Sequence, residues 1–289
     1  MAYAMAQKVW LITGTSSGFG RRLVNAVLER GDRVIASARS LETIQDFPSN
    51  PDLHLLQLDI TAGTEVVKAR VDAAAAVWKS IDVVVNNAGE GLPGLLEEGG
   101  SKKLIEQYRV NVFGTFDVTT AVLPYMRKQK SGTVVCMGSR SGWKPERTGL
   151  GFYASSKAAV HALGETLALE VAPFNIRVLI VEPGSFRTEK VYRHPFDEAN
   201  PIDDYDEDRK RISSTWRSIA GKEPGDPTKA MKAVVDVVRG EGYAAGKAWP
   251  LYLVLGRDAD RDIRDKCAKM IRHLDEWNEV VQGVDFDQL

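Results

Sequence analysis

Cysteine is scarce in this sequence, which limits the kinds of site that the chain can hold. The 289 residues include two cysteines, Cys136 and Cys267, which lie far apart, each within an apolar pattern. Because a disulfide framework or a zinc site needs paired ligand spacing, both are interpreted as packing residues. The four histidines show no ligand spacing either: His54, His161, His194 and His273. The sequence therefore predicts no metal site.

An excess of one charge and long apolar runs are also missing. Lys and Arg number 38 against 39 Asp and Glu, a net charge of -1 that leaves no basic surface for nucleic acid or an anionic membrane. No apolar run approaches the roughly 18–20 residues that span a bilayer. Eight residues precede the first apolar run at Val9, too few for a signal peptide. We expect no nucleic-acid or membrane partner and a cytoplasmic location.

Short apolar runs alternate with longer amphipathic ones, which is typical of βα units on a parallel sheet. The expected strands are Val9–Thr13, Arg33–Ser37, Leu53–Leu58, Ile81–Asn86, Thr133–Met137, Ile176–Val181 and Leu251–Val254. The expected helices include Gly18–Glu29, Gly63–Lys79, Asn111–Arg127 and Phe152–Ala172. Pro124 is expected to kink or end the third helix near its last turn. We predict one α/β domain over residues 1–289, a Rossmann-type, doubly wound, seven-stranded parallel sheet with helices on both faces.

Two segments fall outside this alternation. Residues 187–227 form a long, charged insertion after a strand at the ligand-binding edge, which favours a substrate lid over a surface helix on a solvated loop. Four of its side chains fall on one helical face: Tyr205, Ile212, Trp216 and Ile219. Residues 258–281 carry a second helical stripe, interpreted as a packing helix: Ile263, Cys267, Ile271, Leu274 and Val281.

A glycine-rich loop, Thr13–Gly20, joins the first expected strand to the first helix. Its glycines let the backbone approach a pyrophosphate, and the helix N-terminus offers free N–H donors. Glycines also mark any tight turn, but the strand–turn–helix context favours a dinucleotide site. The second strand is followed by Ala38 and Arg39, so the acid that binds the ribose of NAD is absent. Arg39, unless it is merely a solvated surface residue, can pair with a 2′-phosphate, which predicts NADP(H) with NAD(H) less favoured.

Tyr153 and Lys157 lie four residues apart at the start of an expected helix and share one face. A phenol has a pKa of about 10, and a nearby ammonium is expected to lower it toward neutrality. Such a tyrosine could protonate a ketone oxygen during hydride transfer and take the proton back in reverse. A Tyr–Lys pair alone is usually structural, so its interpretation depends on its surroundings.

With these motifs together, the sequence resembles the short-chain dehydrogenase/reductases from about Lys8 to Leu255. The family's motifs occur in its order: TGTSSGFG at 13–20, Leu58-Asp59-Ile60, Asn86-Asn87-Ala88-Gly89, Asn111 in VNVFG, Ser139 after VVCMG, YASSK at 153–157, and Pro183-Gly184 leading to Thr188. The resemblance implies an oxidoreductase that interconverts a ketone and a secondary alcohol. An epimerase or dehydratase of the family and a non-catalytic cofactor sensor on the same fold are the alternatives.

The resemblance also implies roles for particular residues. Ser139 would bind the substrate oxygen, Tyr153 would be the acid/base, Lys157 would hold the nicotinamide ribose, and Asn111 would hold a water in the proton relay. The expected cofactor-binding residues are Gly14, Ser16, Ser17, Gly18, Phe19, Arg39, Asp59, Ile60, Asn87, Ala88, Gly89, Val110, Tyr153, Lys157, Pro183, Gly184, Phe186 and Thr188.

The expected substrate-binding residues are Ser139, Ser141, Trp143, Tyr153 and Trp216. Arg140 departs from the small residue that many relatives carry after the serine, which would place a bulky cation near the pocket. An apolar wall is expected from Leu92, Leu95, Leu96, Trp143, Phe186 and the stripe from Tyr205 to Trp216. This wall predicts a medium-sized hydrophobic carbonyl or alcohol as the substrate.

Two expected helices carry more apolar residues than one packed face needs. The helices Phe152–Ala172 and Asn111–Arg127 are apolar around most of their circumference and require a second cover. In the short-chain dehydrogenase/reductases, which the sequence resembles, these helices form a four-helix interface between subunits. The resemblance therefore implies a homodimer or homotetramer. The competing hypothesis is that the C-terminal helix at 258–281 covers them within one chain.

Overall fold

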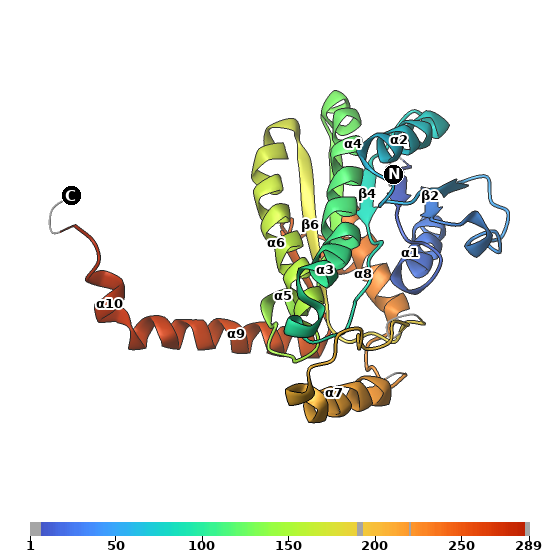
Figure 1. Ribbon diagram of the computed structural model, residues 1–289. Coiled ribbons are helices and arrows are strands. Elements are labelled where there is room, and N and C mark those ends of the chain that lie inside the picture. The colour runs from blue at the N-terminus through green and yellow to red at the C-terminus, as the bar shows by residue number, and fades with distance from the viewer. Residues whose placement is uncertain (1–6, 190–192, 220, 287–289) are drawn as a thin grey trace.

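Seven parallel strands form one sheet in the computed structural model, which describes residues 7–189, 193–219 and 221–286. Their order is β3-β2-β1-β4-β5-β6-β7, and every neighbouring pair is parallel (Figure 1). The bounds are β1 Val9–Ile12, β2 Arg33–Ala38, β3 Leu53–Gln57, β4 Val83–Asn86, β5 Gly132–Met137, β6 Ile176–Pro183 and β7 Tyr252–Leu255. The predicted Rossmann-type fold is confirmed. The strand order reverses between β1 and β4, where such sheets bind their ligands.

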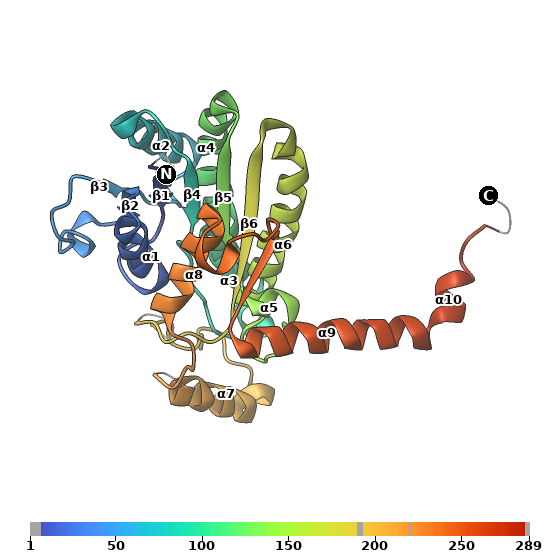
Figure 2. The same ribbon diagram turned by 180° about the vertical axis from the view of Figure 1, so that it is seen from behind.

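Helices cover both faces of the sheet. One core layer packs α2 (Thr64–Trp78), α4 (Thr115–Gln129) and α6 (Gly151–Val171) against the sheet, and the other packs α1 (Gly18–Glu29) and α8 (Pro227–Arg239) (Figures 1 and 2). Successive residues of β1 serve opposite layers, Trp10 one and Leu11 the other. Burial on both faces explains why the strands read as continuous apolar runs.

The structure corrects the third predicted helix. Its expected first residues form a π turn, Arg109–Gly114, that joins α3 (Leu96–Tyr108) to α4. Pro124 lies inside α4 and does not end the helix. The helix continues to Gln129, and Val122 and Met126 are buried against the sheet. Neither α3 nor α8 was predicted.

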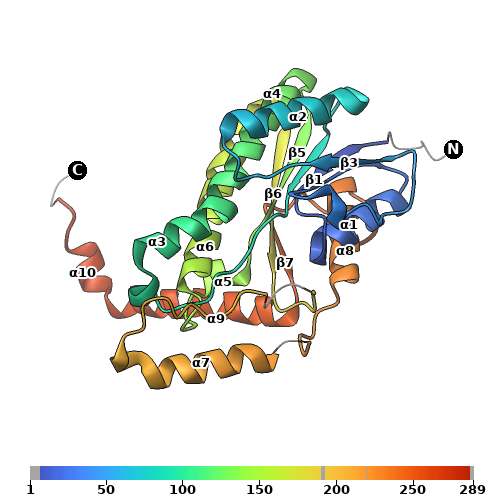
Figure 3. The ribbon, with the colours of Figure 1, turned by 45° about the vertical axis from the view of Figure 1, so that its right-hand side comes forward.

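The insertion at 187–227 contains α7 (Asp206–Ile219), which lies below the body of the molecule in Figure 3. A small cluster of Leu95, Phe196 and Ile212 attaches it to α3. Beside this cluster the buried Glu98 carboxylate is bound by the Arg209 guanidinium and accepts the Ile202 N–H at 2.9 Å. Residues 190–192 and 220, and the Ile219 side chain named in the predicted stripe, lie outside the described part of the chain.

The C-terminal helix does not pack as predicted. In α9 (Arg257–Glu276) only Ala259 and Asp262 are buried, at the end near α5 (Arg140–Trp143). The remainder extends away from the body and leads to α10 (Asn278–Gln282), so it leaves α4 and α6 uncovered (Figures 1 and 2). The hypothesis of an internal cover is therefore wrong. Among the described helices, none is long and apolar enough to cross a membrane.

Candidate active site

A cavity of about 470 Å³ opens at the strand-order reversal, within the size range of small-molecule sites. Most of the predicted cofactor residues line it: Gly14, Ser16, Ser17, Gly18, Phe19, Arg39, Asp59, Ile60, Asn87, Ala88, Gly89, Val110, Tyr153, Lys157, Pro183 and Thr188. Gly184 and Phe186 do not. A Cβ at position 184 would meet the Asp258 carboxylate at 2.0 Å, and the Phe186 ring packs edge-on against Phe19.

Close packing of backbone explains the glycines of the β1–α1 loop. Gly14 has a φ of +69°, and a Cβ there would lie 2.7 Å from the Ala88 Cα. The Thr13 hydroxyl accepts the N–H groups of Asn87 and Ala88 at 3.0 Å. The Asn87 amide donates in return to the carbonyls of Thr13 and Gly14. These bonds hold the two loops as one rigid floor on which a dinucleotide fits without side chains in its way.

The N-terminus of α1 faces this floor and carries an anion from the chain itself. Its N-cap, Ser17, makes no side-chain capping bond. The Gly18 N–H donates to the Glu189 carboxylate at 2.9 Å, and Arg22 pairs with the same carboxylate at 2.6 Å. The Arg22 hydrogen bond leads the causes that lower the pKa of Glu189 to about 2. The site therefore binds an anion, and its donors suit a diphosphate.

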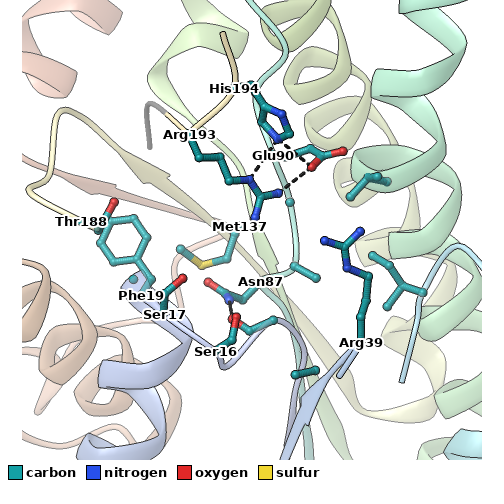
Figure 4. A pocket seen from close by; sticks show the side chains of 18 of the residues that line it. Ser16, Ser17, Phe19, Arg39, Asn87, Glu90, Met137, Thr188, Arg193 and His194 are labelled. Atoms are coloured by element: carbon teal, nitrogen blue, oxygen red, sulfur yellow. Dashed lines mark hydrogen bonds and ion pairs between the residues drawn. The ribbon is translucent and has the colours of Figure 1, made fainter. Parts of the chain in front are cut away.

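The end of the cavity next to β2 contains a cation, the Arg39 guanidinium. Arg39 follows β2, and its side chain is exposed beside the cavity (Figure 4). Within the described ranges no carboxylate pairs with its guanidinium. Ala38 leaves the end of β2 without an acid, and the Asp59 carboxylate already accepts two hydrogen bonds from Thr61. This arrangement suits a 2′-phosphate better than a bare ribose.

Ser139 and Tyr153 meet at the other end. Ser139 is the N-cap of α5, at the end of β5, and Tyr153 lies in the first turn of α6. The Ser139 hydroxyl lies near enough to the Tyr153 phenol to lower its pKa, and the Ser141 N–H donates to Ser139 Oγ at 3.1 Å. Ser141, predicted to contact substrate, does not line the cavity; its backbone orients Ser139.

The pKa of Tyr153 is raised, whereas the sequence led us to expect that Lys157 would lower it. The Lys157 ammonium donates to the Met137 carbonyl at 2.6 Å and lies 5.8 Å from the centre of the Tyr153 ring. Burial lowers the pKa of Lys157 to about 8. Burial also raises the pKa of Tyr153, and the Ser139 hydroxyl opposes only part of that rise. Desolvation of the phenol therefore outweighs any nearby positive charge.

A buried contact between a carboxylate and a histidine lies behind Ser139. Glu182 is fully buried in β6, and its carboxylate contacts His161 Nε2 at 2.7 Å. Burial raises the pKa of Glu182, although His161 opposes this effect. The negative charge of Glu182 in turn raises the pKa of both Tyr153 and Lys157. The charge state of this pair thus influences the two residues expected to handle the proton.

Asn111 lies in the π turn next to the site, a helix irregularity that often marks functional positions. Its amide donates to the Glu90 carbonyl at 2.9 Å and to Ser156 Oγ at 3.0 Å, and its oxygen accepts the Glu90 N–H. These bonds fix the loop after β4 against α6. A Cβ added at Gly89 would lie 3.2 Å from the Asn111 oxygen and 3.7 Å from the Lys157 ammonium, so these two groups are neighbours.

The expected apolar wall is wrong except at Trp216, which lines the cavity. Trp143 packs against the rings of His161 and Tyr252 instead. Leu95 belongs to the cluster that anchors α7. Leu92, Leu96 and Phe186 do not line the cavity either.

Arg140 does not enter the pocket, contrary to the expectation. Its guanidinium pairs with Asp262 at 2.6 Å and with Asp258 at 3.0 Å, and it donates to Ser185 Oγ. Both carboxylates belong to the first turns of α9. Arg140 therefore fastens the base of the C-terminal helix to the rear of the site.

A charged network that sequence reasoning missed borders the cavity. The Glu90 carboxylate pairs with Arg193 at 2.6 Å and with His194 Nε2 at 3.0 Å, as Figure 4 shows. All three residues line the cavity together with Leu150, Met137, Tyr153 and Trp216. The network joins residues about a hundred positions apart, so no local motif could have revealed it.

Comparisons with known proteins agree with this geometry. A family model described as short chain dehydrogenase matches residues 8–196. Oxidoreductase BOA17 of Botryotinia fuckeliana is 32% identical over 277 residues, which cover 94% of this chain and 97% of that protein. The 3-ketodihydrosphingosine reductase of Bacteroides thetaiotaomicron is 37% identical over 188 residues, 64% of this chain and 66% of that protein. The structure of a short-chain dehydrogenase from Streptomyces avermitilis is 36% identical and covers 97% of this chain and 100% of that one, with a TM-score of 0.84.

Proposed function

This chain belongs to the short-chain dehydrogenase/reductase family of oxidoreductases, and we propose that it interconverts a ketone and a secondary alcohol with NADP(H) as its cofactor. The observation that carries the proposal is the proximity of Ser139 to the Tyr153 phenol, which lines the cavity together with Lys157 and the β1–α1 floor. Ser139 and Tyr153 supply the two hydroxyls that a carbonyl oxygen needs in order to be held and protonated.

The proton chemistry follows from the burial of these groups. The raised pKa of Tyr153 keeps the phenol protonated, as the donor of a reduction must be. The Ser139 hydroxyl, oriented by the Ser141 N–H, holds the carbonyl oxygen beside the phenol. The nicotinamide supplies or accepts the hydride when it is bound. Lys157 brings a cation to the same wall, and Asn111 fixes the loop after β4 on which Glu90 lies.

The choice of NADP(H) rests on Arg39. An exposed guanidinium without a carboxylate partner in the described ranges, next to a strand end that lacks an acid, favours a 2′-phosphate by a charge-assisted bond. Solved structures with this fold have been obtained with NADP (Burkholderia cenocepacia, 24% identity, TM-score 0.70) and with NAD⁺ (a xylitol dehydrogenase, 25% identity, TM-score 0.70). The fold itself therefore accepts both cofactors, and Arg39 makes the choice.

The substrate is a medium-sized and mainly hydrophobic carbonyl compound or alcohol. Leu150, Met137 and Trp216 supply apolar surface near Tyr153, and Glu90 with Arg193 adds one polar edge. A polar group some distance from the reacting carbon would contact this edge. The Bacteroides relative, whose name denotes a reductase of a ketone, supports the reaction class.

A panel of carbonyl compounds tests the proposal. Purified protein is incubated with NADPH and each compound, and oxidation of the cofactor is followed at the nicotinamide absorbance band. We expect turnover with hydrophobic ketones, none with Tyr153→Phe, and slower turnover when NADH replaces NADPH. Turnover that survives in Tyr153→Phe would contradict the assigned acid. Binding of NADPH with no turnover of any ketone or of the matching alcohols would favour a cofactor sensor.

A further inference from the structure

The helices that follow β7 carry an apolar stripe that, beyond the base of α9, no other described segment covers. We name residues 257–286 the C-terminal arm; it contains α9 and α10 and extends from the body (Figures 1 and 2). Beyond its base the arm is exposed, including large apolar side chains such as Met270 at 50%, Leu274 at 52% and Trp277 at 61%. Covering such a stripe would lower the free energy of the protein, and the hydrophobic core of the same chain lies too far from the stripe to cover it.

The spacing of the stripe is that of a coiled-coil seam. Its apolar positions are separated by alternating steps of four and three residues: Ile263, Cys267, Met270, Leu274, Trp277, Val281 and Val284. A 3.5-residue repeat keeps one face of a helix turned toward a second helix along its length. The first four positions lie in α9, which ends at Glu276; at Trp277 the backbone leaves the helical conformation, and α10 turns away from the axis of α9 (Figures 1 and 2). The expected occupant is therefore another helix.

The charges of the arm select its partner and direction. Residues 261–272 carry five basic and two acidic side chains, a net charge of +3. Residues 274–286 carry four acidic side chains and no basic ones: Asp275, Glu276, Glu279 and Asp285. Two arms side by side in the same direction would place like charges together, whereas opposite directions place the basic half of each arm beside the acidic half of the other.

The same distribution argues against a lipid surface. Helices that lie on membranes carry Lys and Arg along their polar face, which anionic headgroups attract. Here the most exposed apolar residues lie in the acidic half, where headgroups would repel them. Two of the basic residues, Lys266 and Lys269, already form ion pairs with Glu146 at 3.4 and 3.1 Å.

We propose that two copies of this chain associate by pairing their C-terminal arms antiparallel along this stripe. In an antiparallel register centred on residue 272, the seam of α9 pairs across the interface as 270 with 274, and 267 with 277 at the end of the helix. The interface is distinct from the predicted four-helix contact of α4 and α6, which stays a prediction and uses neither α9 nor α10. Loss of arm pairing therefore halves the mass of whatever oligomer forms.

Light scattering of the full chain at micromolar concentration tests the proposal with two matched variants. Leu274→Glu places a charge on the stripe, and Ala268→Glu places the same charge on the opposite, exposed face of α9. We expect wild type and Ala268→Glu to share one mass, and Leu274→Glu to have half of it with unchanged NADPH binding and thermal unfolding. Equal masses for all three proteins would overturn the proposal.

Cross-linking tests the direction. Cys136 is buried, so Cys267 is the accessible thiol of the described chain. In the antiparallel register the two Cys267 residues lie about ten residues apart, roughly 15 Å, which no disulfide spans. We expect no linked dimer of wild type on oxidation with copper phenanthroline, and a linked dimer of Trp277→Cys through Cys267 of the partner subunit. A wild-type disulfide would overturn the antiparallel arrangement. Retention of wild type, but not Leu274→Glu, on phosphatidylserine vesicles would show a membrane as the occupant instead.

Discussion

The substitution Glu189→Gln tests whether the Glu189 carboxylate competes with the diphosphate of the cofactor for the N-terminus of α1. In the structure the Glu189 carboxylate accepts the Gly18 N–H and pairs with Arg22, so it holds the donors that suit a diphosphate. Glutamine keeps the size of the side chain and an acceptor oxygen but removes the charge. We therefore expect the variant to bind NADPH more tightly than wild type.

The pKa of Glu189 sets the size of the effect. A fall from 4.5 to about 2 corresponds to roughly 3.4 kcal/mol of favourable interaction, but this side chain is 53% exposed, and solvent screening leaves about 1 kcal/mol. Because the folded pKa is depressed, this stabilisation is present above the unfolded pKa near 4.5 and is lost as pH falls toward 2. At neutral pH the variant should lose about 1 kcal/mol of unfolding free energy and bind NADPH about fivefold more tightly.

Fluorescence titration of the cofactor-free protein with NADPH measures the affinity, and thermal unfolding measures the stability. Glu198→Gln is the matched control, because Glu198 is an exposed carboxylate in the same insertion with no described contact to α1. It should change neither quantity. An NADPH affinity of Glu189→Gln equal to that of Glu198→Gln, or weaker, would show that the carboxylate does not compete with the diphosphate.

Three further predictions concern residues of the cavity. Tyr153→Phe should lower kcat by on the order of 10²-fold or more while the dissociation constant for NADPH, from the same titration, stays within twofold. Arg39→Ala should cost roughly 1.5–3 kcal/mol of NADPH binding with little change for NADH; equal losses with both would show that Arg39 only supports its loop. Lys157→Met should raise the unfolding free energy of the cofactor-free protein at pH 7 by roughly 2 kcal/mol. The reason is that the pKa of Lys157 is lowered to about 8 in the folded protein. The charged lysine therefore destabilises the fold fully below pH 8, and this destabilisation disappears as the pH rises toward the unfolded pKa of 10.5. A gain in stability that does not change with pH would contradict this explanation.

The sheet could be predicted because its strands are buried on both faces. The runs at 9–12 and 133–137 are apolar without alternation, and the predicted strand bounds differ from the observed ones by at most two residues. The predicted bounds of α1 match the structure. By contrast α8 was missed, although Asp226 caps its first turn and Pro227 begins it. Both are recognised start signals, hidden here inside a segment interpreted as a lid.

The cofactor half of the site could be predicted because its residues are adjacent in the sequence. Gly14 and Gly18 belong to one loop, and Asn87 to Gly89 belong to a second that packs on it. The substrate half is formed by contacts between distant segments, such as Glu90 with Arg193. Trp143 was predicted to lie on the apolar cavity wall, but tertiary packing places it against His161.

Two of the ion pairs that hold the insertion over the cavity differ in burial, and this difference determines which of the two a ligand can replace. The pair of Glu98 and Arg209 is almost completely buried, and removal of one partner of such a pair costs about 3–5 kcal/mol. The pair of Glu189 and Arg22 is largely exposed and contributes about 1 kcal/mol. A diphosphate at the N-terminus of α1 competes with the weaker of these two pairs. The stronger pair keeps α7, and Trp216 with it, at the substrate end while the cofactor enters.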